Sequence, residues 1–410
     1  MNRLVTALFV VLLWCTAHAR QIIVTAGGPL RSIKEALLLA DHGDSVIVRG
    51  GLYRENNLVI DKAIHLIGED QPVIDGEFRH HMLTVTADHV LISGMVFQNS
   101  GVSYIQENAA IKLDGVKHCR IIANRFVDNF FAIYLAKSEH CQIIDNEIRS
   151  RAQRESAAGN GIHLWYCKTI TIEKNRIQGH RDGIYFEFVE DGTILGNSSE
   201  RNLRYGLHFM FSNNCRYRNN YFRDNGAGVA VMYTKHVLME NNRFENNWGP
   251  AAYGLLLKDI SDSHIRGNHF LKNTVGIYAE GSNRNRIHEN SFDGNGWAIR
   301  LMANCLENIF SANSFVKNSF DVATNSRQNF NQFSGNYWSR YKGYDLDRDG
   351  VGDVPFRPVR LFSIIAERQQ PAIILLHSFF IHLLEIAEAV FPILTPETLI
   401  DEQPLMRNIL

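Results

Sequence analysis

The chain has 410 residues, of which 45% are hydrophobic, so it can bury a large core. Its formal net charge is −1 and no basic tract stands out, which argues against nucleic acid as a partner. A single repeat runs through most of the sequence and predicts one main domain, over residues 20–340.

Residues 1–19 have the composition of a secretory signal peptide. A positive charge at Arg3 precedes the apolar run from Leu4 to Cys15, and Ala17-His-Ala19 fits a cleavage site. A membrane anchor is the weaker interpretation, because this apolar run is too short to span a bilayer. We therefore expect the mature chain to begin near Arg20 and to reside outside the cytoplasm.

The next element is a short helix. Ser32 and Glu35 have the spacing of a capping box just before the apolar run from Ala36 to Ala40. We expect this helix to cover the open end of a solenoid, since uncovered ends expose unpaired strands. Short apolar runs then recur at Val46, Ile64 and Val90.

Asparagine recurs from residue 124 to residue 336 at intervals of 22 to 29 residues, most of them 22 or 23. Phe, Ile or Trp stands two positions after every one of these asparagines except one, where Ser199 replaces it. A second phrase keeps the same rhythm: a Gly or Ala followed by apolar, variable and apolar residues, as in Gly161-Ile-His-Leu. The recurring asparagines are Asn124, Asn146, Asn175, Asn197, Asn220, Asn242, Asn268, Asn290, Asn313 and Asn336.

This repeat predicts an all-β fold, a right-handed parallel β-helix. A fixed short period indicates a solenoid, and 22–23 residues are too few for the common helical repeats. Alternating apolar residues within each phrase are typical of strands. Coils stack about 4.8 Å apart, so each asparagine lies over the next and we expect an internal amide ladder at one corner. The Gly or Ala is expected where a β-carbon would crowd the backbone.

Five cysteines follow the signal segment. Cys119, Cys141 and Cys215 each precede a ladder asparagine by five residues, which places them in one inward phase of the coil. They could form a thiolate metal site, but buried core cysteines are the favoured interpretation. Cys119 and Cys141 could also oxidise to a disulfide, although nothing in the sequence requires it.

One outward column carries candidate metal ligands. Alternation along the strands directs four pairs away from the core, and together they predict a copper site or a protein-docking stripe. Thioether and imidazole groups suit Cu(I) in an oxidising compartment. The candidate copper ligands are His208, Met210, Met232, Glu187 and His163, and Trp165 and Tyr185 are candidate docking residues beside them. Extra residues within Ser150–Asn160 and Asn246–Tyr253 should project from one corner and flank these coils.

The segment 341–370 is expected to be a linker that contains a calcium-like loop. Carboxylates alternate along Asp345, Asp347, Asp349 and Asp353, with Gly350 for a sharp turn and Val351 as a backbone ligand. An EF-hand would carry Glu at the twelfth position, where this chain has Phe356. Structural Ca²⁺ and an Asx-rich turn without metal both remain open.

The C-terminal tail, 371–410, contains the apolar stretch from Ala372 to Phe391. Its length would allow a transmembrane helix, but the acidic and histidine residues within it argue against lipid on all sides. We expect an amphipathic helix that caps the last coil, docks on a membrane-embedded partner, or does both. The candidate docking residues are His377, Phe379, Phe380, Leu384 and Phe391.

A carbohydrate-active enzyme is the alternative function, because many β-helices are polysaccharide lyases or hydrolases. Such enzymes need two converging carboxylates, or calcium with a basic residue. Glu187 is the one carboxylate in the outward column, and the phrases typical of pectin hydrolases and pectate lyases are missing. We therefore expect a protein that is not an enzyme.

The whole chain resembles the exported NosD-type maturation proteins of nitrous oxide reductase. The most specific motif runs from Gly335-Asn-Tyr-Trp to Val354-Pro-Phe356, and the apolar tail with Pro404-Leu-Met-Arg407 follows it. Arg340, where members often carry Asp, and Asn408, where Pro is common, depart from the family pattern.

The resemblance implies a periplasmic accessory protein that works with an ABC transporter, a copper chaperone and nitrous oxide reductase in assembling a copper–sulfide centre. It implies that the solenoid is a docking and relay surface and that the C-terminal helix seats it on the permease. ATP hydrolysis belongs to the partner, since this chain has no phosphate-binding loop. Whether copper, a sulfur species or only a partner is held stays open.

Overall fold

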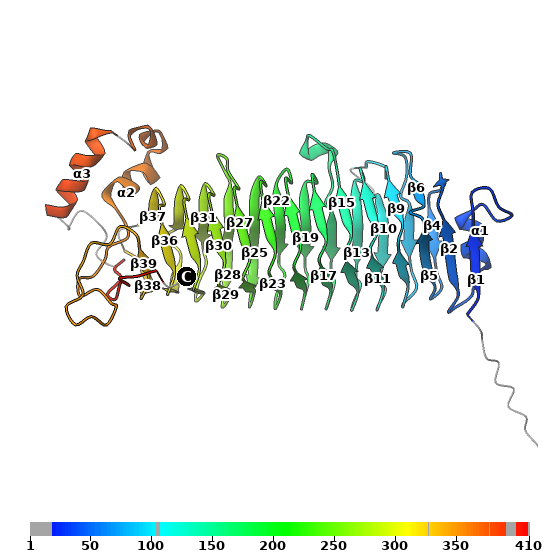
Figure 1. The fold of residues 1–410 in the computed structure, drawn as a ribbon, viewed down its shortest axis with the longest axis horizontal. Helices are drawn as coiled ribbons and strands as arrows, with labels where there is room; N and C mark the ends of the chain where they lie inside the picture. The colour runs from blue at the N-terminus through cyan, green and yellow to red at the C-terminus, as the bar shows by residue number, and fades with distance from the viewer. Residues whose placement is uncertain (1–18, 104–106, 327, 377, 391–398, 409–410) are drawn as a thin grey trace, which may run out of the picture.

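The computed structural model describes residues 19–103, 107–326, 328–376, 378–390 and 399–408. The predicted signal segment therefore lies outside the described residues, except for Ala19. The chain forms a right-handed parallel β-helix, a straight rod with a helical cap at each end (Figure 1). The predicted fold class is confirmed.

Three parallel sheets run along the rod, and each full coil contributes one strand to each sheet. Sheet A contains β1 (Gln21–Val24), β2 (Ser45–Arg49), β5 (His65–Glu69), β8 (Leu91–Ser93), β11 (Arg120–Ile122), β14 (Gln142–Ile144), β17 (Thr171–Glu173), β20 (Thr193–Leu195), β23 (Arg216–Arg218), β26 (Leu238–Glu240), β29 (His264–Arg266), β32 (Arg286–His288), β35 (Leu306–Ser311) and β38 (Phe330–Ser334). Sheet B contains β3 (Leu52–Tyr53), β6 (Val73–Asp75), β9 (Val96–Gln98), β12 (Arg125–Val127), β15 (Glu147–Arg149), β18 (Arg176–Gln178), β21 (Ser198–Glu200), β24 (Tyr221–Arg223), β27 (Arg243–Glu245), β30 (His269–Leu271), β33 (Ser291–Asp293), β36 (Ser314–Val316) and β39 (Tyr337–Trp338). Sheet C contains β4 (Leu58–Ile60), β7 (Leu83–Val85), β10 (Ala109–Asp114), β13 (Phe131–Ala136), β16 (Ile162–Trp165), β19 (Asp182–Glu187), β22 (Tyr205–Met210), β25 (Ala227–Lys235), β28 (Tyr253–Ser261), β31 (Val275–Glu280), β34 (Trp297–Leu301) and β37 (Phe320–Thr324).

The predicted asparagine ladder lies at the corner between sheets A and B. Asn220 shows its bonding: the side-chain amide donates to Ile194 O at 2.9 Å and to Asn242 Oδ1 at 3.0 Å. Its own Oδ1 accepts from the backbone N–H of Asn197 at 2.8 Å. The ladder thus satisfies backbone groups that the corner would otherwise leave buried and unpaired.

Two further ladders were not predicted. One lies at the corner between sheets B and C, five residues after the first, and includes Asn202, Asn225, Asn247, Asn273, Asn295 and Asn318. A shorter ladder lies five residues before the first, at Asn285, Asn308 and Asn331. All three corners of the later coils are therefore held by amide side chains.

The small residue of the second phrase is required by close approach of the next coil. A β-carbon on Gly183 would lie 2.0 Å from Ser199 Oγ and 2.6 Å from Gly206 O. The aromatic residue two places after each asparagine stacks inside the rod, as in Phe270 over Phe292 at 4.8 Å. Identical positions in successive coils thus make continuous core columns.

The N-terminal cap is the predicted helix, α1 (Ile33–Leu39), and this prediction is confirmed. Ser32 Oγ accepts from the Glu35 N–H at 3.2 Å, as a capping residue should. Glu55, from the next coil, accepts from the Ile33 and Lys34 N–H groups at 2.8 and 2.9 Å. These bonds fix the helix over the open end of the β-helix.

The C-terminal end differs from the predicted single helix. It consists of α2 (Leu361–Arg368), the 3₁₀ helix η2 (Gln370–Leu375) and α3 (Phe379–Val390), and α2 falls within the segment expected to be a linker. Phe362, Ala366 and Ile381 pack with Phe320 of β37. The apolar end of the last coil therefore selects two short packed helices over one long one.

Residues 399–408 then return to the last coil. Asp401 takes the place of the next ladder asparagine, because its Oδ2 accepts from Asn336 N, Asn336 Nδ2 and Trp338 Nε1, each at 3.0 Å. One carboxylate thus ends the first ladder.

Candidate metal site

Sheet C brings most of the predicted metal ligands into one column. Glu187 pairs with Met210, and Met210 pairs with Met232, so these three residues occupy successive coils in β19, β22 and β25. All three side chains are half-buried. The predicted stacking of the two methionines is therefore confirmed, and His208 lies two residues before Met210 on the same strand.

His208 points away from the interior but is only 5% exposed, so the expected surface imidazole is covered. Tyr185 and Tyr205 pack against its ring at centroid distances of 4.9 and 4.7 Å. Its Nδ1 lies 3.3 Å from Arg204 Nη2 and 3.6 Å from Asp182 Oδ2. Among the described residues, its buried Nε2 has no hydrogen-bond partner.

Asp182 holds this side of the imidazole in place. The carboxylate accepts two bonds from Arg204, at 2.9 and 2.6 Å, and is itself fully buried. Burial raises the pKa of Asp182, but the bonds from His208 and Arg204 outweigh it and hold the pKa below its usual value. Of these two neighbours only the Asp182 carboxylate can accept an Nδ1–H, and that tautomer leaves Nε2 unprotonated and able to bind a ligand.

His163 lies apart from the other candidate ligands. It pairs with Tyr185, which in turn pairs with His208, so two coils separate the histidines. Its ring stacks between Tyr134 and Tyr185 at 4.6 and 4.8 Å, and Asn160 Nδ2 lies 3.0 Å from its Nδ1. Burial lowers the pKa of His163 to about 3, so the ring is a neutral packing group.

The two predicted docking aromatics on this face are half-buried rather than free. Trp165 packs on a cluster that includes Phe131 and Tyr134, and Lys137 Nζ lies 5.5 Å from its ring. Burial is the main cause that raises the pKa of Tyr185 to about 12. Both side chains therefore pack against their neighbours beside the column and offer only part of their surface to a partner.

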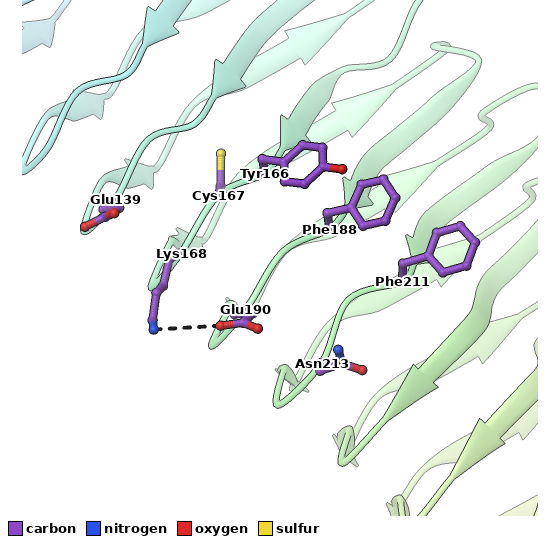
Figure 2. Close-up of a pocket in the computed structure, with 8 residues that line it drawn as sticks. All are labelled: Glu139, Tyr166, Cys167, Lys168, Phe188, Glu190, Phe211 and Asn213. Carbon is purple, nitrogen blue, oxygen red and sulfur yellow. Dashed lines mark ion pairs between the residues drawn. The ribbon is translucent and has the colours of Figure 1, made fainter.

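An aromatic row of three exposed rings and the half-buried Phe188, which the sequence analysis missed, flanks the column. We name Tyr166, Phe188, Phe211 and Tyr233 the aromatic stair, since each follows Trp165, Glu187, Met210 or Met232 directly. Successive rings stack at 4.5, 5.1 and 5.0 Å. Figure 2 shows three of these rings beside a hollow of about 360 Å³ that Glu139, Lys168, Glu190 and Asn213 also line.

The backbone conformation explains why strand alternation did not predict the aromatic stair. All four residues have φ between 50° and 54°; Tyr166, Phe188 and Phe211 directly follow their strands, and Tyr233 lies within β25. A left-handed residue at a strand end belongs to neither face of the strand. The usable signal was the aromatic residue that follows each outward pair.

Both predicted insertions leave the corner between sheets B and C, as expected. The first contains the 3₁₀ helix η1 (Glu155–Ala157), and the second presents Trp248, which is 62% exposed. The aromatic stair lies at the opposite edge of sheet C. The candidate column is therefore flanked by loops on one side and by aromatic rings on the other.

The predicted calcium-like loop brings three of its carboxylates together. Within the described part of the chain, the one group of at least three His, Cys, Asp or Glu residues whose donor atoms already lie within 4.8 Å of one another is Asp345, Asp347 and Asp349. Asp345 Oδ1 is buried without a hydrogen-bond partner among described residues. Asp353 instead accepts from the Leu346 N–H at 2.7 Å, and Val351 pairs with Leu405.

The cysteines do not converge with the column. Cys119, Cys141, Cys167, Cys215 and Cys305 are all buried and free, and they form no cluster with other donors among the described residues. Cys119 and Cys141 are not joined by a disulfide. The core interpretation of these side chains agrees with the structure.

The tail presents a second apolar surface. On α3, Phe379, Leu383 and Ile386 are 74, 48 and 51% exposed and follow one another at intervals of four and three residues. Phe380 is 50% exposed, whereas Leu384 packs toward the cluster around Phe320, so it belongs to the inner face and not to the docking surface. His377 and Phe391 lie outside the described residues.

Comparison with known proteins decides the family. A protein in Pseudomonas aeruginosa named "Probable ABC transporter binding protein NosD" is 30% identical over 370 residues, which cover 86% of each chain. A protein of the same name in Stutzerimonas stutzeri is 27% identical over 86% of this chain and 85% of its own. The chain belongs to the NosD family. Residues 144–343 also match the family model described as "Periplasmic copper-binding protein (NosD)".

Solved structures that resemble this NosD family member show the fold alone. The family 28 exopolygalacturonase of Yersinia enterocolitica has a TM-score of 0.60 at 9% identity and covers 77% of this chain and 78% of its own. The catalytic domain of a GH87 α-1,3-glucanase has a TM-score of 0.58 at 10% identity, covering 78% and 69%. The NosD relatives carry the name of a binding protein, which agrees with the expectation of a non-enzymatic role.

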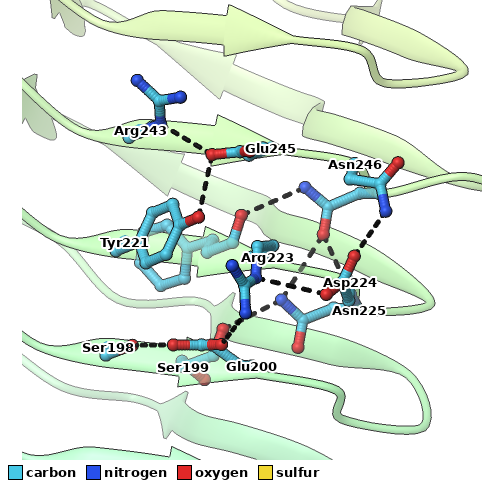
Figure 3. A network of polar contacts seen from close by, with 12 residues as sticks. Ser198, Ser199, Glu200, Tyr221, Arg223, Asp224, Asn225, Arg243, Glu245 and Asn246 are labelled. Carbon is cyan, nitrogen blue, oxygen red and sulfur yellow. Dashed lines mark hydrogen bonds and ion pairs between the residues drawn. The ribbon is translucent and has the colours of Figure 1, made fainter.

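Two carboxylates on sheet B of this NosD family member, Glu200 and Glu245, are bound by arginines (Figure 3). Arg223 contacts Glu200 at 3.0 Å, and Glu245 accepts from Arg243 at 2.7 Å and from Tyr221 at 2.8 Å. Burial raises the pKa of Glu245, but the bonds from Arg243 and Tyr221 outweigh it and lower the pKa. A glycosidase acid needs a raised pKa, so this network does not resemble one.

The NosD family description places these proteins in the periplasm. Among the described residues, each helix is too short or too polar to cross a membrane.

Proposed function

We propose that this chain is a periplasmic accessory protein that holds copper as cargo during maturation of the copper centre of nitrous oxide reductase. In this proposal it works with an ABC transporter and a copper chaperone, after export by the signal segment 1–19. The observation that carries the proposal is the register of Met210 over Met232, beside the buried, unpartnered Nε2 of His208.

The residues present fit Cu(I) as cargo. Two thioethers lie one coil apart, about 4.8 Å along the rod, and imidazole and thioether groups are ligands that Cu(I) accepts. In the tautomer with Nδ1–H toward Asp182 Oδ2, 3.6 Å away, Nε2 of His208 is unprotonated and available to the metal, and Arg204 holds the carboxylate in place. Glu187 adjoins Met210 and adds a carboxylate to the set. His163 stays outside the proposed site.

The surroundings suit transfer of copper rather than permanent storage. The three column side chains of Glu187, Met210 and Met232 are half-buried, so a partner can reach them. The aromatic stair beside them, exposed except for the half-buried Phe188, offers ring edges against which thioether sulfur packs favourably. We propose this stair as the contact for the copper chaperone and the outer face of α3 as the contact for the permease.

The test is an anaerobic Cu(I) titration of the purified chain under reducing conditions. We expect the Met210→Leu/Met232→Leu variant to lose most Cu(I) affinity, since it lacks both thioethers but retains shape and apolar character. Thermal unfolding should be little changed, because neither side chain belongs to the core. Met406→Leu, which removes a half-buried methionine from the tail, is the matched control.

Equal Cu(I) affinity in the double variant and the wild type would exclude the column as the copper site. Copper content of nitrous oxide reductase from cells that carry the double variant gives the second readout. Normal loading there would separate the column from maturation.

A structural Ca²⁺ in the loop formed by Asp345, Asp347 and Asp349 is the second part of the proposal. Three carboxylates and a buried, unpartnered oxygen of Asp345 support it. The ion would fix the loop against the returning segment, where Met406 N–H donates to Gly350 O at 3.0 Å.

A further inference from the structure

Three histidines stack on the surface at the corner that follows sheet C. His89, His118 and His140 lie on successive coils, because β8 pairs with β11 and β11 pairs with β14. Their ring centroids are 5.0 and 5.2 Å apart, with interplanar angles of 9° and 8°. We propose that this histidine ladder is a surface binding site for a divalent transition-metal ion, with Cu²⁺ bound most tightly.

The backbone fixes the spacing of the ladder. The N–H groups of His89, His118 and His140 donate to carbonyl oxygens of the next coil at 3.0, 3.2 and 3.0 Å. All three residues have φ between 54° and 60° and all three side chains are exposed. Adjacent imidazoles are therefore held in register by main-chain bonds, while the rings remain free to turn.

The corner itself does not require histidine. The equivalent position in later coils carries Thr169, Asp191 and Asn214, each with φ between 53° and 56°. Histidine tolerates this left-handed conformation better than most residues, which explains one histidine there but not three in succession. The run of stacked imidazoles is thus a separate property of these coils.

Coordination needs the exposed rings to rotate out of the stack. A metal–nitrogen bond of about 2.0–2.1 Å places two nitrogens on one ion at most about 4 Å apart. A nitrogen lone pair lies in the plane of its ring, and the stacked planes are nearly parallel and about 5 Å apart, so two adjacent rings must turn toward one another about their side-chain torsions before their nitrogens reach one ion. His118 belongs to both adjacent pairs, and it is therefore the ligand that either pair needs.

The surrounding charges suit a cation with open coordination positions. Asp88 precedes His89, and its Oδ1 accepts from the Lys117 N–H at 2.7 Å. Glu139 precedes His140 and pairs with Lys117 Nζ at 2.9 Å. Imidazole binds Cu²⁺ more tightly than the other divalent first-row ions, and water can complete the coordination.

The ladder is independent of the proposed copper column. It lies between residues 89 and 140, outside the residues 144–343 that match the family model. It contains imidazoles and no thioether, so it should select Cu²⁺ where the column selects Cu(I). An experiment that excludes one of the two sites therefore does not exclude the other.

The experiment is a Cu²⁺ titration of the full chain, made without a polyhistidine tag, with electron paramagnetic resonance of the bound ion. The key variant is His118→Asn, because asparagine tolerates the left-handed backbone but cannot replace the imidazole. The matched control is His236→Asn: His236 occupies the same corner with φ 57° and is exposed, but Asn214 and Asp262 are its neighbours.

We expect nitrogen couplings from imidazole in the wild-type spectrum. Loss of outer-shell partners typically costs about 10–100-fold in metal affinity, so loss of the shared ligand in His118→Asn should cost at least about tenfold. His236→Asn should bind Cu²⁺ like the wild type. Unchanged affinity in His118→Asn, an equal loss in His236→Asn, or no Cu²⁺ binding by the wild type would each overturn the proposal.

Discussion

Asp321 is a buried carboxyl group at the end of the second asparagine ladder, beneath the C-terminal cap. Its side chain is 3% exposed, and Asn318 Nδ2 donates to it at 3.4 Å. Burial is the largest influence and raises its pKa from 3.8 to about 6, although Arg340, Asn318 and Arg360 oppose the rise. One residue therefore makes the stability of the last coil depend on pH.

We predict that Asp321→Asn stabilises the chain at pH 7 and not at pH 3.5. The unfolded chain ionises this group near pH 3.8 and the folded chain near pH 6, so stability falls as pH rises between these values. A difference of about two pKa units corresponds to about 3 kcal/mol in the free energy of unfolding above pH 6. Denaturant unfolding at both pH values measures it, with exposed Asp61→Asn as the control. An equal effect at both pH values would contradict the prediction.

At the scale of single residues, the sequence predicted the structure where the same residue type stacks on itself in successive coils. Stacked coils place Asn220 over Asn242, so the first ladder and the Met210–Met232 register followed from spacing. The cover over His208 did not follow, because Arg204 and Tyr205 reach it from the start of the strand. Alternation shows which way a strand residue points, but it does not show which long side chain folds over it.

At the scale of elements, the loop at Asp345–Asp349 tests the calcium proposal. Three carboxylates within 4.8 Å of one another repel when no cation lies between them. Free Ca²⁺ at roughly ten to a hundred times its Kd should add about 1–3 kcal/mol to the free energy of unfolding. We predict that Asp347→Asn/Asp349→Asn abolishes this gain, as measured by thermal unfolding with and without Ca²⁺.

Asp353→Asn is the control for the loop. Its carboxylate bonds to the Leu346 N–H and does not join the three-carboxylate group, so the variant should retain the Ca²⁺ response. If Ca²⁺ does not change the unfolding temperature of the wild-type chain, the loop is an Asx-rich turn without metal.

The two caps show why one helix was predictable and the other was not. The capping-box residues Ser32 and Glu35 mark α1 locally. Helix α2 has eight residues and no side-chain cap, so it would be marginal in isolation. It forms where Phe362 and Ala366 cover Phe320 of the last coil, a contact between residues distant in sequence. Tertiary packing, which no local pattern records, decides that element.

At the scale of the whole molecule, the rod has different ends (Figure 1). Helix α1 covers the N-terminal coil, whereas the tail covers the other end with the inner face of α3 and leaves the outer face exposed. Apolar residues on both faces of a surface helix indicate a partner for the outer one. In our proposal that partner is the permease, which would hold the rod by its C-terminal end.

We predict that Phe379→Ser/Leu383→Ser/Ile386→Ser prevents co-purification with the ABC transporter. These side chains are 74, 48 and 51% exposed, so the variant should remove the contact and preserve the fold, as circular dichroism can check. Point variants are preferable to deletion from Pro371, because deletion would also uncover Phe320 and Phe362.

The matched control lies at the opposite end of the rod. Leu38 and Leu39 of α1 are 72 and 60% exposed, so Leu38→Ser/Leu39→Ser removes comparable apolar surface without touching the tail. Capture by the transporter should survive this change, because the proposed contact is made by one end alone. The proposed contact between the outer face of α3 and the permease would be wrong if the α3 variant is still captured by the transporter. It would also be wrong if both variants lose capture equally.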